Sequence, residues 1–191
     1  MRVIAGDYRG RTLKALKGDT TRPTTDRVKE SLMSALVSAT GGFEDLCVLD
    51  AFAGSGQLGI EALSRGAARV CFCEQGRDAL RIVESNLNAC KVDRSRYQVL
   101  RSDSLKLPQR SGLPQFDLVF LDPPYAFEAK QVFEWIRAMD EAGKLAKDAV
   151  VSYEYDRKSA QEVSVEVDAL KWTTVSARTY GDTAVVILRR S

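Results

Sequence analysis

Four residues near the middle of the chain, Asp122-Pro123-Pro124-Tyr125, follow an apolar run at 116–121 and combine acceptors, a rigid backbone and an aromatic ring. Prolines lack an N–H and fix φ, so they hold the preceding carbonyl groups in set directions. The Asp122 carboxylate and the Pro123 carbonyl can together accept both hydrogens of an exocyclic amino group, while Tyr125 stacks on the ring that bears it. Two acceptors also aim the nitrogen lone pair at an electrophile, which is catalysis by positioning. The structural alternative is a rigid turn that ends a strand.

A glycine-rich loop is the second chemical signal. Residues 54–59 fit the pattern G-x-G-x-x-G, and Glu74 follows about 20 residues after the first glycine. Glycines let a ligand approach the backbone closely, and an acid at this distance can accept hydrogen bonds from both ribose hydroxyls. Asp50 stands at the loop entrance, where its charge would repel a pyrophosphate. S-adenosylmethionine carries a ribose, an ammonium and a sulfonium but no phosphate, so we predict it as the cofactor; the alternative is a tight turn without a ligand.

Two other classes of protein remain as alternatives. The glycine pattern alone also favours an NAD-dependent oxidoreductase, but the chain has no His and no Tyr-x-x-x-Lys to donate a proton to a substrate. A non-catalytic RNA-binding module could keep the same fold as a scaffold. Such a module should have lost Asp122, Tyr125 or the glycines, and this chain keeps them all.

The elements that must position these residues alternate along the chain. Buried apolar runs predict strands at 46–52, 69–74, 97–100, 116–121 and 149–155. Helical periodicity predicts helices at 27–37, 57–64, 78–89 and 128–142. Hairpins are expected from 2–5 with 11–13, and from 173–179 with 183–189. Alternating β-α-β units imply an α/β fold with a mostly parallel sheet covered on both faces and an antiparallel pair at one edge. Ligands then bind at the carboxyl ends of the strands, where Asp50, Glu74, Asp103 and Asp122 stand.

Composition bounds the remaining possibilities. The 191 residues suggest one domain, and the absence of His excludes a Ser-His-Asp triad and a His-ligated metal. The four cysteines form no C-x-x-C pair, so we expect reduced thiols and no metal. No run of 18 apolar residues and no apolar leader are present, so we expect no membrane association and a cytoplasmic location. We expect a monomer.

Positive charge is concentrated at the N-terminus. Residues 1–29 hold eight basic and three acidic side chains, a net charge of +5. The other residues hold 20 basic and 23 acidic side chains, a net charge of −3. A basic arm on a near-neutral body is typical of nucleic-acid binders, because a few cations suffice for phosphate contacts. A solvated, mobile terminus is the alternative.

Taken together, these features resemble the RsmD family of class I S-adenosylmethionine-dependent methyltransferases. The segments that carry the resemblance are RVIAG at 2–6, RGR at 9–11, TRPTTDRVKE at 21–30, FAGSG at 52–56 and GIEALSRG at 59–66. The resemblance implies a Rossmann-like sheet of seven strands with an N-terminal β-hairpin extension that binds RNA. It also implies methyl transfer to N2 of one guanine in 16S ribosomal RNA, either free or in an assembling 30S subunit. A DNA amino-methyltransferase is the alternative, but 191 residues leave no room for a domain that reads a DNA sequence.

The resemblance also assigns roles to residues. The target guanine would be held by Asp122, Pro123 and Tyr125. The cofactor would be contacted by Asp50, Gly54, Ser55 and Gly56 at its methionine part, by Glu74 at its ribose, and by Asp103 and Ser104 at its adenine. RNA would be contacted by Arg9, Arg11, Arg22 and Arg27. The alternatives are that Arg9 and Arg11 are only solvated, and that Arg22 is a surface charge or closes with the loop at 21–27 over the cofactor. Residues 1–25 are then the hairpin and loop extension, and 26–191 the catalytic core.

Overall fold

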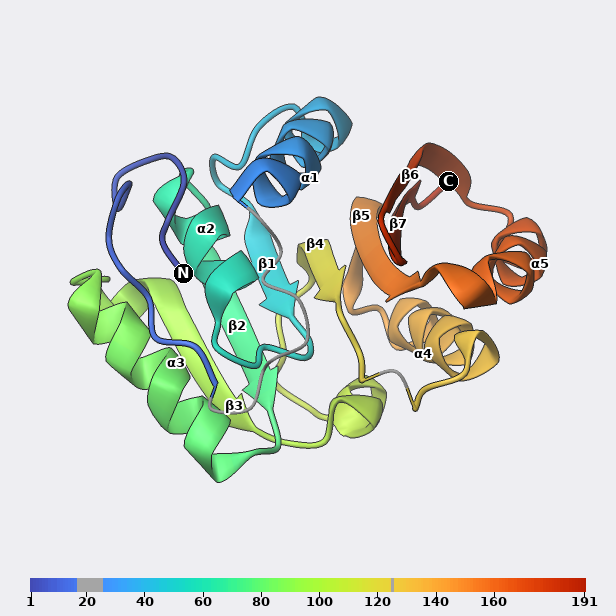
Figure 1. The fold of residues 1–191 in the computed structure, drawn as a ribbon. Coiled ribbons are helices and arrows are strands. Elements are labelled where there is room, and N and C mark those ends of the chain that lie inside the picture. The colour runs from blue at the N-terminus through green and yellow to red at the C-terminus, as the bar shows by residue number, and fades with distance from the viewer. Residues whose placement is uncertain (17–25, 125) are drawn as a thin grey trace.

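The computed structural model of the chain describes residues 1–16, 26–124 and 126–191, and for Asp26 only the backbone. These residues form three layers, a seven-stranded sheet with helices on both faces (Figure 1). The strands are β1 Cys47–Asp50, β2 Arg69–Glu74, β3 Tyr97–Arg101, β4 Phe116–Leu121, β5 Leu145–Asp156, β6 Thr173–Tyr180 and β7 Thr183–Arg189. The α-helices are α1 Asp26–Thr40, α2 Gln57–Ser64, α3 Arg77–Ala89, α4 Ala129–Glu141 and α5 Ala160–Leu170.

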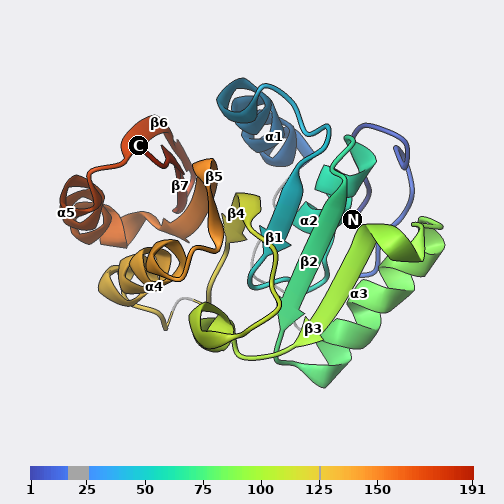
Figure 2. The same ribbon diagram turned by 180° about the vertical axis from the view of Figure 1, so that it is seen from behind.

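The sheet has the order β3-β2-β1-β4-β5-β7-β6, so the predicted fold class is confirmed. Strands β1 to β5 pair in parallel, and only β7 runs antiparallel to its neighbours β5 and β6. From β1 the chain moves outward to β3 and then returns to place β4 on the other side of β1 (Figure 2). Ligands of such sheets bind where the strand order reverses, which here is at the carboxyl ends of β1 and β4.

Both faces of the sheet are buried, as expected for parallel strands. Successive side chains point to opposite faces, so Val48 packs with α1, α2 and α3, whereas Leu49 packs with α4. Both side chains are fully buried. The strand predicted at 46–52 ends at Asp50, which places that carboxyl group at the very end of β1.

The N-terminal segment (residues 1–16) forms a hairpin with less strand pairing than predicted. It has a single bridge between Arg2 and Thr12, and no strands. Val3 and Leu13 are nevertheless 1% and 2% exposed, and they belong to the same core cluster as the residues of α1 and α2. The segment is therefore packed onto the sheet's helical layer.

One helix was absent from the sequence-based prediction. In α5, Val163, Val165 and Val167 alternate with polar residues, which is the period of a strand, and only Val163 is buried. The helix lies beside α4, with which it makes an ion pair between Arg137 and Glu166 at 3.1 Å. Over the described residues, no helix combines the length and the apolar character needed to span a membrane.

Candidate active site

A cavity of about 1150 Å³ opens at the carboxyl ends of β1 and β4. Its volume exceeds the roughly 300–1,000 Å³ of a pocket for one small ligand, so it has room for two. Strand ends, α1, α2, the N-terminal segment and the β6–β7 hairpin all contribute to its wall. The predicted site residues in its lining are Asp50, Gly54, Ser55, Glu74, Ser104, Asp122 and Pro123.

Asp50 is the most deeply buried carboxyl group of the cavity wall, at 3% exposure. Its Oδ2 accepts a hydrogen bond from the Gly59 N–H at 3.0 Å. Burial raises the pKa of Asp50 to about 7, and the negative charges of Asp122 and Glu74 add to the rise, while the Gly59 N–H opposes it. A positively charged group in the cavity would favour the ionised form and lower this pKa.

Each glycine of the loop has a structural reason to be glycine. Gly54 and Gly56 have φ values of +53° and +77°, a region that other residues rarely adopt. Gly59 lies in α2 against β2, and a Cβ there would come 2.3 Å from the Phe72 Cε1. Among the described residues, a Cβ on Gly54 would meet the Leu16 side chain at 3.7 Å and the Phe52 carbonyl oxygen at 4.0 Å, and no atom closer than these. The backbone at Gly54 is therefore open to a ligand.

Glu74, at the end of β2, is fixed by both of its oxygens. Oε2 accepts the Gly54 N–H at 3.0 Å, and Oε1 accepts the Gly76 N–H at 2.7 Å. The carboxylate thus braces the glycine loop and faces the cavity. Each oxygen keeps a further acceptor site, so the group can still receive a hydrogen bond from a ligand.

Asp103 and Ser104 begin the short 3-10 helix η2, Ser104–Gln109. Asp103 accepts the Leu105 N–H at 3.0 Å and does not line the cavity. Ser104 reaches the cavity wall, but its hydroxyl donates to the Ala51 carbonyl oxygen, and its own carbonyl accepts the Trp135 indole N–H at 2.7 Å. Both residues anchor η2, and their predicted contacts with adenine stay a prediction.

The turn after β4 brings the acceptors of the Asp122 motif to the cavity. Asp122 is exposed to it and Pro123 is buried in its wall. Phe127 donates its N–H to the Pro124 carbonyl at 3.0 Å, and its ring packs edge-to-face on Phe52 at 5.5 Å between centroids. Tyr125, like Arg22, lies outside the described residues, so its predicted stacking role is not addressed by the structure.

The polar residues of the cavity wall that sequence reasoning missed include Lys29, Gln57 and Glu154. Lys29 is 2% exposed, and its Nζ donates to the Arg2 carbonyl at 3.1 Å. Its spacing with the buried Leu32 and Leu36 places it on the core face of α1, which is the signal that could have found it. Gln57 begins α2, and its buried Nε2 has no acceptor among the described residues. Glu154, on β5, follows the buried Tyr153, and strand alternation turns it to the cavity side.

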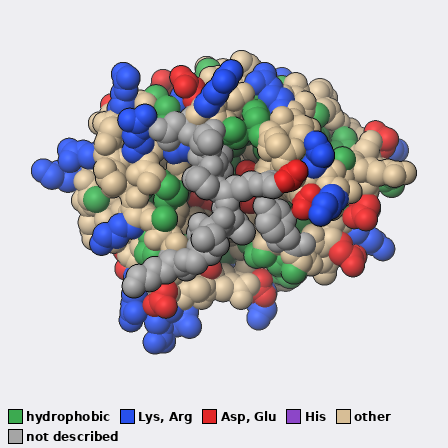
Figure 3. Space-filling view, viewed as in Figure 1, with side chains coloured by type: hydrophobic (Ala, Val, Ile, Leu, Met, Phe, Trp, Pro, Cys, Tyr) green, Lys and Arg blue, Asp and Glu red, His purple; other side chains and the backbone are tan. Residues whose placement is uncertain are grey.

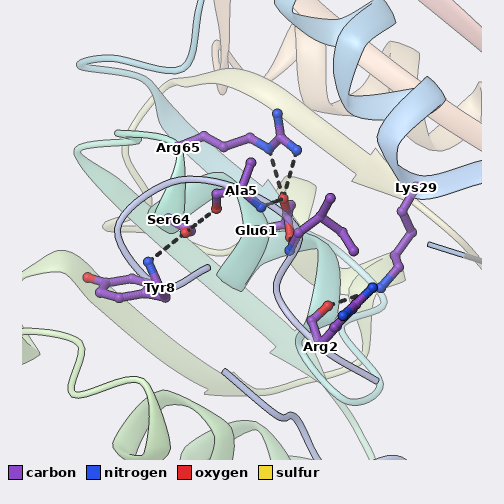
Figure 4. Close-up of polar contacts among 8 residues, drawn as sticks. Arg2, Ala5, Tyr8, Lys29, Glu61, Ser64 and Arg65 are labelled. Carbon is purple, nitrogen blue, oxygen red and sulfur yellow. Dashed lines mark hydrogen bonds and ion pairs between the residues drawn. The ribbon is translucent and has the colours of Figure 1, made fainter. Parts of the chain in front are cut away.

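Backbone groups of the N-terminal segment bind side chains of α2 (Figure 4). The buried Glu61 carboxylate accepts the Ile4 and Ala5 N–H groups at 2.9 and 3.2 Å, and it pairs with Arg65 at 2.8 Å. The Ser64 hydroxyl accepts the Tyr8 N–H at 2.9 Å. These bonds fix the path of the segment across α2.

Asn86 of α3 connects the same segment to the glycine loop. Its Oδ1 accepts the Lys14 N–H at 2.8 Å, and its Nδ2 donates to the Ser55 carbonyl at 2.9 Å. Asn86 is 1% exposed, so these bonds are shielded from water. Leu16, two residues after Lys14, then reaches the cavity wall beside the loop.

Three of the four arginines predicted to contact RNA lie in the described part of the chain. Arg9 and Arg11 flank Gly10 in the N-terminal turn, Arg27 is in the first turn of α1, and all three are exposed. Figure 3 shows Lys and Arg side chains gathered at the left of the view, over the N-terminal segment and α3. The structure thus leaves these cations accessible.

Comparisons with known proteins agree with this architecture. The family model described as "Conserved hypothetical protein 95" matches residues 1–189. "Ribosomal RNA small subunit methyltransferase D" of Haemophilus influenzae is 37% identical over 182 residues, which are 95% of this chain and 89% of that protein. The protein of that name from Escherichia coli K12 is 37% identical over 154 residues, 81% of this chain and 74% of its own length. The solved structure "Putative methyltransferase yhhF from Escherichia coli" is 31% identical, with a TM-score of 0.79, and covers 100% of this chain and 98% of its own.

Proposed function

Because the chain belongs to the family described as conserved hypothetical protein 95, the RsmD family that its motifs resemble, we propose that it transfers a methyl group from S-adenosylmethionine to N2 of one guanine in small-subunit ribosomal RNA. The observation that carries the proposal is one cavity lined by the glycine loop, by Glu74 and by the Asp122-Pro123 pair. Cofactor groups and amino-group acceptors thus share one space, large enough for both ligands. The names of the relatives support ribosomal RNA as the substrate.

The charge and the volume of the cavity support the proposed cofactor. When bound, S-adenosylmethionine supplies an electrophilic methyl group. Glu74 would hold its ribose hydroxyls, and Asp50 would face its ammonium group, whose charge favours the ionised carboxylate. The open backbone at Gly54 permits close approach, and the unpaired Gln57 Nε2–H offers a donor to an acceptor atom of the ligand. Ser55 and Gly56 complete the loop on the methionine side, with Asp103 and Ser104 beside the adenine.

The residues after β4 would prepare the target nitrogen. The Asp122 carboxylate and the Pro123 carbonyl accept the two N2 hydrogens and turn the lone pair towards the methyl donor. The new N–C bond would form as the methyl–sulfur bond of the donor breaks, which releases a neutral thioether and leaves the nitrogen with one proton in excess. Asp122, which already accepts one of its hydrogens, takes that proton. Tyr125 is proposed to stack on the base.

We also propose how the RNA is held. Arg9, Arg11, Arg22 and Arg27 contact phosphates of the 16S RNA, free or in an assembling subunit. The chain then works as a single methyltransferase domain of residues 1–191, monomeric, in which 1–25 form the RNA-binding extension.

Substitution of Asp122 tests the proposal. We expect Asp122→Ala to lower kcat on small-subunit RNA or 30S particles by roughly 100–1000-fold, as loss of a positioned catalytic acceptor does elsewhere. S-adenosylmethionine affinity, measured by calorimetry, should change little, and Asp122→Asn should be milder because its amide keeps an acceptor oxygen. Asp78→Ala, at an aspartate of α3 that is 88% exposed, is the matched control and should keep full activity. Wild-type turnover in Asp122→Ala would overturn the proposal.

A further inference from the structure

Glu154 lies next to Asp122 in the sheet. Leu121 of β4 pairs in parallel with Tyr153 of β5, so the residues that follow them, Asp122 and Glu154, are adjacent beyond the end of β4. Tyr153 packs on the α4 face. Glu154 therefore points to the opposite face, where Val185 of β7 is its partner and also lines the cavity. A second carboxyl group thus faces the space proposed for the target base.

The surroundings of Glu154 favour its neutral form. Burial, together with the negative charge of Asp122, raises the pKa of Glu154 to about 8. The cavity is also lined by the carboxyl groups of Asp50 and Glu74, by Lys29 of α1 and by uncharged polar residues, namely Ser55, Gln57, Gln75, Ser104, Tyr180 and Thr183. Lys29 already donates to the Arg2 carbonyl, and no hydrogen bond or ion pair joins the Glu154 side chain to any residue that the structure describes.

The fold itself gives no reason for a carboxyl group at this position. On the same face of the sheet, Val150 of β5 and Val185 and Ile187 of β7 are apolar, and Ser152, between Val150 and Glu154, is buried and polar. An acid that is half-buried and finds no hydrogen-bond partner in the described part of the chain costs stability, and such groups in a cavity mark functional sites. A neutral carboxyl group offers one donor, its O–H, beside one acceptor, its C=O.

We propose that Glu154 is a specificity-determining residue that reads the Watson–Crick edge of the target guanine beside Asp122. The inference rests on the proposed function. The Watson–Crick edge of guanine presents three groups in order: the 2-amino group, the N1–H donor and the O6 acceptor. The Glu154 C=O accepts the N1–H and its O–H donates to O6, while Asp122 and Pro123 take the N2 hydrogens. Enzymes that act on an unstacked base read it through such an edge.

This arrangement discriminates against bases that carry an amino group but lack the N1–H donor and the O6 acceptor beside it. Adenine has an acceptor at N1 and no O6. 2-Aminopurine is the sharper probe, because it keeps the 2-amino group and has neither the N1–H nor O6. A site built to pair with an N–H discriminates strongly against an analogue that lacks it, since its own polar groups then stay unpaired. Gln has a carbonyl and an N–H₂ in the place of the C=O and O–H, so it can make the same two bonds.

The test uses ligated small-subunit RNA with either guanine or 2-aminopurine at the methylated position, in the form, free or assembled, that the wild-type protein modifies. We expect the wild type to favour guanine by at least tenfold in kcat/KM. In Glu154→Ala, kcat/KM should fall at least tenfold on guanine and change little on 2-aminopurine. The ratio of kcat/KM on guanine to kcat/KM on 2-aminopurine should therefore fall towards one. Glu154→Gln should keep kcat/KM on guanine within about threefold of the wild-type value, and it should keep the wild-type preference for guanine over 2-aminopurine. S-adenosylmethionine affinity should be unchanged in both variants.

The outcomes separate this inference from the proposed function. If the wild type forms no N2-methylguanosine, the proposed function fails whatever Glu154 does. If the wild type is active and Glu154→Ala keeps the wild-type ratio, or is slowed equally on both bases, Glu154 does not read the base and the inference is wrong. Glu154→Val, which suits a strand and removes both polar groups, repeats the test should the alanine variant fail to fold.

Discussion

The substitution Asp50→Asn should stabilise the ligand-free protein in a manner that depends on pH. The pKa of Asp50 rises from 3.8 to about 7 on folding, mainly through burial. Because one pKa unit corresponds to about 1.4 kcal/mol, ionisation of this group costs the folded state roughly 4 kcal/mol. Asn is nearly isosteric and keeps an oxygen that can accept the Gly59 N–H, but it carries no charge to desolvate.

The direction of the pH dependence follows from which state holds the proton. Below about pH 4 both the folded and the unfolded chain keep Asp50 protonated, so its ionisation has no effect on stability. Between about 4 and 7 only the unfolded chain has released the proton, and wild-type stability falls with rising pH by about 1.4 kcal/mol per unit. Above about 7 both states are ionised and the full penalty remains. The Asn variant lacks this contribution.

The measurement is urea unfolding of both proteins, without ligand, from pH 5 to pH 9. The variant's free energy of unfolding minus that of the wild type should increase by roughly 2 kcal/mol from pH 5 to pH 7 and then level off. Groups that do not interact with Asp50 titrate alike in both proteins and cancel in this difference. Asp78→Asn, at an exposed position, should show a flat difference. A flat difference for Asp50→Asn would refute the burial argument and remove the reason to place a cationic ligand group there.

Two further predictions concern the ligands. Glu74→Ala should weaken S-adenosylmethionine binding by about 1.5–3 kcal/mol in calorimetry, through loss of a charge-assisted hydrogen bond; unchanged affinity in a folded variant would remove Glu74 from the cofactor site. The double variant Arg9→Gln/Arg11→Gln should show a shallower slope in a plot of log RNA affinity against log salt concentration, by about 0.7–0.9 for each phosphate that the protein no longer neutralises. The control Lys130→Gln, on α4, should leave this slope unchanged. An unchanged slope in the double variant would mean that the two arginines are only solvated. Substitution is preferable to truncation here, because Val3 and Leu13 are core residues.

Local signals made much of the fold predictable from the sequence. The bounds predicted for α2, β2 and β4 agree with the structure, because glycines or prolines stand at their ends. The N-terminal hairpin has less strand pairing than its local sequence predicts, because the N–H groups of Ile4 and Ala5 donate to the Glu61 carboxylate instead of to a partner strand. Glu61 lies 57 and 56 residues away from them in the sequence. A competitor so distant in sequence leaves no trace in the pattern of the hairpin itself.

The site could be predicted where a motif marks it. Asp50 and Glu74 each end a strand and Asp122 directly follows one, so the rule that ligands bind at carboxyl ends was enough to bring them together. Glu154 and Lys29 lie inside a strand and a helix, and they reach the cavity only because β5 lies beside β4 and α1 covers that face. Such placements depend on tertiary packing, which no single segment encodes.

The identity of the methylated nucleoside tests the central claim most directly. Small-subunit RNA and 30S particles from a strain that lacks this protein are incubated with it and S-adenosylmethionine, and the digested RNA is analysed by mass spectrometry. We expect one methyl group per RNA, in N2-methylguanosine, and formation of this nucleoside at a rate roughly 100–1000-fold lower with Asp122→Ala. A methyl group on a ring carbon or a ribose oxygen would contradict the claim, because neither has amino hydrogens for Asp122 and Pro123 to hold.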